Sequence, residues 1–339
     1  DHRDLHSFPT RRSSDLQVCA YLAAHLAFEW VARRFLIISG AEYLVLGLLL
    51  GPQVAGLIRA EVVGGFGPLM TLALGWIGAV IGAQFHLPTL VRVPGVHFRI
   101  AALEAVVTFA LVSGAMLVVV APLFGLGWAE AVEPAVALGA IAVASAPAGF
   151  ALVSRRVGAR GPVLRQLEVT AAIDAVVAVF GFGLLLSIVH VEPAVLPRSP
   201  TATEWAVIGV GIGVLGGALF HLFLGGERKT DRLFIALAGA IILVSGAAAY
   251  LRLSPLLPAL LVGLILVNTS PARAEIKQVL GRVERPLYFA LLVFAGAAWQ
   301  PGALASVVVV VAFLVVRVGA KLFGGWVAAA VAEGLPVLG

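Results

Sequence analysis

The sequence has little charge and almost no cysteine. Asp, Glu, Lys and Arg make up 12% of its 339 residues and hydrophobic residues make up 61%, whereas soluble proteins average about 25% charged residues. This composition excludes an ordinary soluble domain. The single cysteine, Cys19, excludes an intramolecular disulfide and a cysteine-rich zinc site. The HExxH, Walker and serine-elbow motifs are also absent from the sequence, so no motif points to an enzyme.

Long apolar stretches recur along nearly the whole chain. A helix needs about 20 apolar residues to cross the roughly 30 Å of hydrocarbon in a bilayer. Dividing the chain at its polar and Pro/Gly-rich breaks predicts about eleven spans: 17–33, 36–58, 65–88, 98–126, 132–153, 163–190, 204–225, 231–250, 254–268, 285–300 and 303–331. The sequence therefore predicts an all-α polytopic membrane protein.

Basic residues are concentrated in every second connecting region. Fifteen lie in the odd-numbered loops, and three lie in the even-numbered loops: Arg59, Arg198 and Arg252. Because cytoplasmic loops carry excess Lys and Arg, the first span is predicted to begin outside and the last to end inside. We expect an integral protein of a bacterial plasma membrane with its N-terminus outside. The basic residues form no single stripe, which argues against a nucleic-acid partner.

Residues 1–16 differ from the rest of the chain. They lack the apolar core of a signal peptide and contain three Asp and three Arg. The run HSFPTRRSSDL (6–16) resembles the translation of a sequencing adapter, and the alternative is a disordered tail. Neither interpretation assigns chemistry to this segment, so the transmembrane domain is predicted to be 17–339.

Two ionisable residues are predicted to lie deep in the membrane. Asp174 is about eleven residues into its span, or about 16 Å deep, and Arg317 reaches a similar depth from the other side. Glu29, Glu42 and Glu104 lie closer to the ends of their spans, within reach of interfacial water. An ionisable group at the bilayer centre costs at least ~2.5 kcal/mol and usually marks an ion or proton path. The alternative is a static ion pair that fixes helix packing.

Pro147 interrupts the fifth predicted span. It lacks an N–H donor and its ring displaces the carbonyl of Val143, so we expect the helix to break. The Ser145 hydroxyl and the freed carbonyls near Gly149 could then coordinate a dehydrated cation together with Asp174, as in transporters with discontinuous helices. Taken alone, the proline is equally compatible with a simple kink.

The seventh predicted span, 204–225, contains the pattern of a dinucleotide-binding fingerprint, GIGVLG (211–216). It lies inside an apolar span with no preceding strand, so nucleotide binding is not expected. Gly209, Gly213 and Gly217 are spaced four apart and therefore share one helix face. This spacing predicts close packing against another helix.

Several stretches resemble the monovalent cation:proton antiporter superfamily. The most specific is ASAPAGFALVSRRVGARGPVLRQLEVTAAIDAVVA (144–178), and the others are GAEYLVLGLLLGP (40–52), GWIGAVIGAQF (75–85), SPLLPALLVGLILVN (254–268) and VVRVGAKLFGGW (315–326). The resemblance implies an inverted-repeat fold, a helix unwound at Ser145-Ala146-Pro147 and an ion-binding carboxylate at Asp174. It also implies a basic partner, placed at Arg317 rather than Lys321.

The resemblance implies that the protein exchanges Na⁺ or K⁺ for H⁺ by alternating access, as a homodimer and without a cofactor. The monovalent cation would bind at Asp174. The family usually carries a polar pair at this site, and two alignments remain open here. Asp174 is either the second member, preceded by Ile173, or the first, followed by Ala175. The second alignment favours a non-transporting sensor or regulatory module that kept the fold, and an anion symporter is a third possibility.

The resemblance also implies a number of helices. Long members of the family have thirteen helices, so we expect the last two helices of the fold to be missing at the C-terminus. Those helices would include a second unwound helix that surrounds the break at Pro147. We therefore expect 17–339 alone to show low thermal stability and no cation-dependent proton flux.

The unequal distribution of basic residues between odd and even loops predicts the orientation of the chain in the membrane. An impermeant thiol reagent applied to intact cells should label a cysteine substituted at Ala202 and spare one substituted at Gly158, because the first lies in an outer loop and the second in a cytoplasmic loop. Labelling at 158 with protection at 202 would show that the orientation is inverted.

Overall fold

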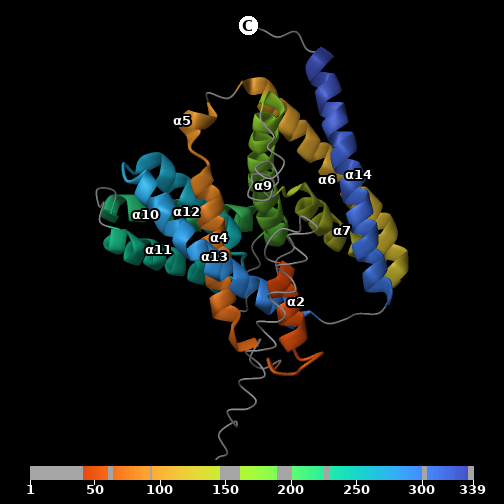
Figure 1. Cartoon of the computed structure of the whole chain (residues 1–339), viewed down its shortest axis with the longest axis horizontal. Coiled ribbons are helices and arrows are strands. Elements are labelled where there is room, and N and C mark those ends of the chain that lie inside the picture. The colour runs from red at the N-terminus through yellow and green to blue at the C-terminus, as the bar shows by residue number, and fades with distance from the viewer. Residues whose placement is uncertain are drawn as a thin grey trace, which may run out of the picture. The chain divides into compact units, whose positions relative to one another are not determined.

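The structure is a computed structural model that describes residues 41–59, 64–91, 94–145, 161–188, 201–224, 230–299 and 304–334 (Figure 1). Its helices are α2 (Ala41–Leu50), α4 (Gly67–Gln84), α5 (Leu87–Leu90), α6 (Gly95–Phe124), α7 (Trp128–Val143), α9 (Pro162–Ile188), α10 (Ala202–Leu224), α11 (Thr230–Tyr250), α12 (Leu256–Thr269), α13 (Arg273–Ala298) and α14 (Leu304–Gly334). Within these described ranges, five stretches are long and apolar enough to cross a membrane: Gly67–Gln84, Gly95–Phe124, Thr203–Phe223, Asp231–Tyr250 and Ala305–Val331. The chain is an integral, all-helical membrane protein.

The predicted spans can be compared with these helices one by one. The second to the eleventh span each overlap a described helix, and α5 is a single additional turn after α4. The first span, 17–33, lies outside the described residues. The helical class is confirmed, and the count of eleven spans is not.

One predicted loop is helical in the structure. The region between spans 254–268 and 285–300 was expected to be a basic cytoplasmic loop, but α13 already begins at Arg273. Ile276, Val279 and Leu280 recur three and four residues apart and are buried in the core of the second unit. This spacing is typical of an amphipathic helix, which a search for uniformly apolar stretches misses.

The chain divides into two compact units. Among the described residues, the first comprises 41–59, 64–65 and 289–299, and here α2 packs on the end of α13. A Cβ added at Gly47 would overlap the backbone of Val293, and the rings of Tyr43 and Phe289 stack with centroids 4.1 Å apart. Close backbone approach and one aromatic pair therefore hold this unit together.

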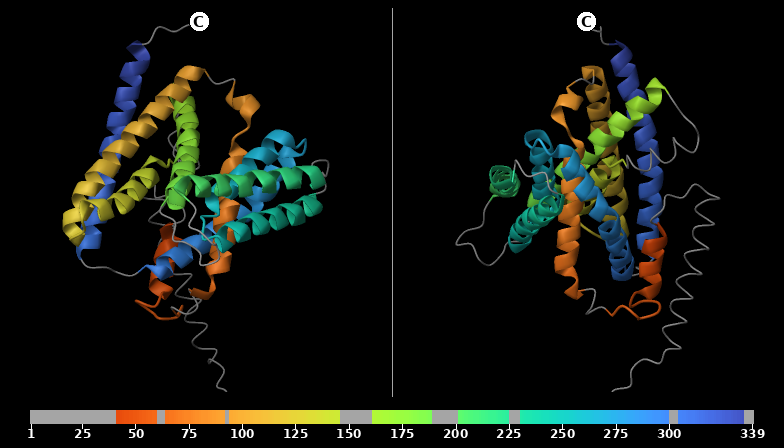
Figure 2. Two further views of the ribbon diagram at one scale, coloured as in Figure 1. Left: turned by 180° about the vertical axis from the view of Figure 1, so that it is seen from behind. Right: turned by 60° about the vertical axis from the view of Figure 1, so that its left-hand side comes forward.

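The second unit contains the remaining described residues and includes a group formed by α4, α10, α11, α12 and the start of α13 (Figure 2). Its core includes Trp76, Leu237, Ile241 and Leu266, each at most 2% exposed. The indole nitrogen of Trp76 donates a hydrogen bond to the carbonyl of Leu280 at 3.0 Å. This bond satisfies the polar group of a buried tryptophan and ties α4 to α13.

Glycines bring the helices of this group into direct backbone contact. A Cβ at Gly82 of α4 would overlap the carbonyl oxygen of Leu260 in α12, and one at Gly263 of α12 would overlap that of Ala79 in α4. Of the predicted stripe on α10, Gly213 and Gly217 pack closely on Pro258 and Ile265 of α12. The packing role predicted for those two glycines is confirmed.

A second helix group in the same unit consists of α6, α7 and α14, with α9 packed against α6 and α7 (Figure 1). Buried Val112 and Met116 of α6 meet Ala131 and Ala135 of α7 and Ala320 of α14. Small residues on two of the three helices allow the close spacing that membrane helices use to associate. Polar side chains from all four helices converge within this group.

The glycine contacts predict a sharp difference between two substitutions. Gly82→Ala should lower the unfolding free energy by about 1–3 kcal/mol, since its Cβ would force α4 away from α12. Gly239→Ala on α11, where a Cβ would meet nothing within 4 Å, is the matched control and should not destabilise. Thermal unfolding in detergent measures both, and equal midpoints would contradict the packing role of Gly82.

Candidate ion-binding site

A cluster of polar side chains lies between α6, α7, α9 and α14. Its members are Glu104 and Thr108 of α6, Ser145 just after α7, Asp174 of α9 and Lys321 of α14. Asp174 is 1% exposed and Glu104 is 6% exposed. Two carboxyl groups are thus buried inside an apolar helix bundle, where charged groups are stable only when they are paired.

Lys321 contacts three other members of the cluster. Its Nζ lies 2.7 Å from Oδ2 of Asp174, 3.0 Å from Oγ of Ser145 and 3.2 Å from Oε1 of Glu104. An ammonium group has three N–H donors, so these three acceptors use its full capacity. Lys321 therefore connects α14 to the other three helices through a single nitrogen.

The two hydroxyl groups orient the carboxylates. Ser145 donates to Oδ2 of Asp174 at 2.6 Å, and Thr108 donates to Oε1 of Glu104 at 2.9 Å. The second oxygen of Asp174, Oδ1, is buried and has no hydrogen-bond partner within the described part of the chain. A buried carboxylate oxygen without a donor is costly, and a bound cation or proton would remove that cost.

Ser145 reaches the cluster because α7 stops early. The helix ends at buried Val143, and Ala144 has an extended ψ of 123°. Val143 is the residue whose carbonyl the ring of Pro147 is predicted to displace. Pro147 and Gly149 themselves lie outside the described residues.

Two solved structures of a sodium proton antiporter have a fold similar to that of this chain. A structure of the sodium proton antiporter MjNhaP1 from Methanocaldococcus jannaschii at pH 8 matches with a TM-score of 0.65 and 17% identity, over 93% of this chain and 78% of that chain. An electron-microscopy structure of the same antiporter matches with a TM-score of 0.58 and 15% identity, over 95% and 79% of the two chains. The chain has the fold of a sodium/proton antiporter. No protein-family model and no curated protein sequence matches it.

The antiporter fold confirms the resemblance drawn from the sequence at the level of the fold. The structures that this chain resembles are those of a transporter and not of an enzyme. Within this fold, Asp174 contacts both Ser145 and Lys321 in the polar cluster. Among the described residues, no group of three or more His, Cys, Asp or Glu is placed to hold a metal ion.

Arg317 occupies a different position from the one expected. Arg317 rather than Lys321 was predicted to be the basic partner of Asp174, but its guanidinium donates to the carbonyls of Ala142 at 3.1 Å and Ala144 at 2.5 Å. The last carbonyls of a helix lack intrahelical donors, and a cation there is also favoured by the helix dipole. Arg317 therefore caps the end of α7, and Lys321 contacts the carboxylates.

Glu104 does not lie where its position in the sequence predicts. It was expected to reach interfacial water, yet it is buried and paired with Lys321. The available signal was Thr108, which lies one helical turn further along the same face of an otherwise apolar helix. Gly324 allows the approach of α14, since a Cβ there would lie 3.1 Å from the carbonyl oxygen of Glu104.

Proposed function

We propose that this protein is a secondary active transporter that exchanges a monovalent cation, Na⁺ or K⁺, for protons by alternating access. The observation that carries the proposal is the buried Asp174, with one unpartnered oxygen, at the junction of four helices in an antiporter fold. An intramembrane carboxylate in such a place is a natural site for an ion or a proton.

Asp174 would bind the cation and the proton in turn. Both ligands compete for the same carboxylate, so binding of one requires release of the other, and this competition couples the two fluxes. Ser145 and the carbonyl of Val143 at the end of α7 would complete the coordination shell, because a dehydrated cation needs several oxygen ligands. Pro147 and Gly149 would keep the chain unwound beside them.

The two basic residues of α14 would divide the supporting roles. Lys321 offsets one carboxylate charge of the site, and Arg317 holds the end of α7 so that Ser145 faces Asp174. They are four residues apart and lie on the same helix face. The transporter would act as a homodimer in a bacterial plasma membrane, with its N-terminus outside.

A non-transporting sensor or regulatory module remains the rival function. It is favoured by the residues beside Asp174, since Ile173 and Ala175 offer no side-chain ligand, and by Lys321, which already occupies Oδ2. In that case the cluster would be a fixed ion pair that sets helix packing.

Substitution of Asp174 separates the two functions. In the full-length protein reconstituted in vesicles, Asp174→Asn should abolish Na⁺- or K⁺-dependent proton movement, since an amide keeps the shape but exchanges no proton near neutral pH. A pH-sensitive dye in the vesicle lumen measures the flux. The matched control is Glu133→Gln on the exposed face of α7, which should exchange at the wild-type rate. Wild-type flux in Asp174→Asn would rule out this residue and favour the sensor.

A further inference from the structure

Glu104 of α6 and Asp174 of α9 contact the same basic side chain, that of Lys321. Their nearest oxygens, Oε1 and Oδ2, lie 3.2 and 2.7 Å from the same nitrogen of Lys321. Both carboxyl groups are more than nine-tenths buried. The two carboxyl groups therefore lie close enough together for one bound cation to interact with both.

The charges of the three groups show why the second acid matters. Asp174 and Lys321 alone are neutral as an ion pair, so a cation bound to them would leave one buried positive charge uncompensated. With ionised Glu104 the three groups carry a net charge of −1, and one cation or one proton brings the cluster to zero. Buried net charge is strongly unfavourable inside a membrane, so the neutral state is the stable one.

Building on the exchange function above, we propose that Glu104 is the second carboxylate of the ion site, supplied by α6. When the cation arrives, the O–H bond of protonated Asp174 breaks and its proton leaves to water. Glu104 stays ionised and Lys321 stays protonated, so the total charge of the site, with its ligand, is zero before and after the step. Thr108 holds the Glu104 carboxylate in place through its hydroxyl group.

The test compares charge removal with charge retention at residue 104. In the full-length protein in vesicles, Glu104→Gln should raise the KM for Na⁺ or K⁺ at least tenfold, while Glu104→Asp should restore most of the affinity because it keeps the charge. Glu133→Gln, an exposed acid on α7, is the matched control and should leave KM unchanged. A merely structural role for Glu104 would instead lower kcat or stability in both variants.

Two results would each overturn part of this assignment. Unchanged KM in Glu104→Gln, with normal exchange by the wild type, would overturn the role of Glu104 alone. No Na⁺- or K⁺-dependent proton movement by the wild type would overturn the exchange function and this role together.

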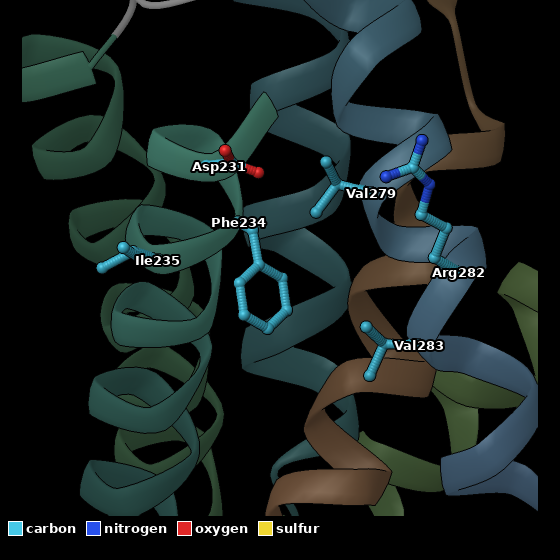
Figure 3. A pocket seen from close by; sticks show the side chains of 6 residues that line it. All are labelled: Asp231, Phe234, Ile235, Val279, Arg282 and Val283. Carbon is cyan, nitrogen blue, oxygen red and sulfur yellow. The ribbon is translucent and has the colours of Figure 1, made fainter. Parts of the chain in front are cut away.

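A separate feature is a groove of about 440 Å³ between α11 and α13 (Figure 3). Its lining consists of Asp231, Phe234, Ile235, Val279, Arg282 and Val283. The figure shows Asp231 and Arg282 on opposite sides of one end, with Phe234 and Val283 further along the groove. Both charged residues are exposed and have no ion-pair partner within the described part of the chain.

The charged residues of the groove are complementary to the headgroup of a zwitterionic lipid. Asp231 lies in the first turn of the apolar helix α11, and Arg282 lies just before the apolar end of α13, so we expect both at the level of the lipid headgroups. Arg282 suits a phosphate, and Asp231 suits an ammonium group that can donate hydrogen bonds. We propose that phosphatidylethanolamine binds here, with an acyl chain along Phe234 and Val283. The quaternary ammonium of phosphatidylcholine has no N–H to donate to Asp231.

Lipid-dependent thermal unfolding of the full-length protein in detergent tests this site. Phosphatidylethanolamine should raise the midpoint more than phosphatidylcholine or phosphatidylglycerol, and the chain-free headgroup glycerophosphoethanolamine should not raise it. Arg282→Gln and Asp231→Asn should each remove the preference, whereas Lys277→Gln, an exposed base on the same helix, should retain it. Equal stabilisation by the three lipids, or a preference that survives Arg282→Gln, would overturn the assignment.

Discussion

The contact between Lys321 and Asp174 is the interaction on which the organisation of the site depends. A carboxylate that is 1% exposed inside a helix bundle must be paired, and the ammonium group 2.7 Å away provides that pair. The same nitrogen also binds Ser145 and Glu104, so α6, α7, α9 and α14 are all linked to one atom. Removing Lys321 would leave two buried carboxyl groups without a counter-charge, which makes the four helices interdependent.

The backbone carbonyl groups at the end of α7 also need polar partners. A helix that stops inside a membrane bundle exposes carbonyl groups that lipid cannot satisfy. Arg317 donates to two of these carbonyls, one helical turn before Lys321 on the same helix. α14 therefore stabilises the broken helix with one basic residue and the buried acids with the next. This arrangement places Ser145, the first polar residue after the helix, against Asp174.

The other helix group of the second unit packs through glycines and apolar side chains. α4, α10 and α12 meet through glycines whose missing side chains allow backbone contact, as at Gly82, Gly213 and Gly263. Such contacts are typical of membrane helices, because lipid provides no hydrophobic force that drives helices together. The unit thus combines a tightly packed apolar group of helices with a polar group around Lys321, and the proposed ion site lies in the second.

The sequence by itself determined the membrane class, the approximate positions of most helices, the packing face around Gly213 and Gly217, and the position of Asp174 near the middle of its helix, because hydropathy and residue spacing are local properties of the chain. Only the tertiary structure decided which basic residue meets Asp174. Arg317 and Lys321 share a face and differ by one turn, so the outcome depended on where α7 ends. It also decided that Glu104 is buried and that α13 begins at Arg273. Distance along one helix does not specify which neighbour faces a side chain, and that neighbour determines whether a charged group is solvated or paired.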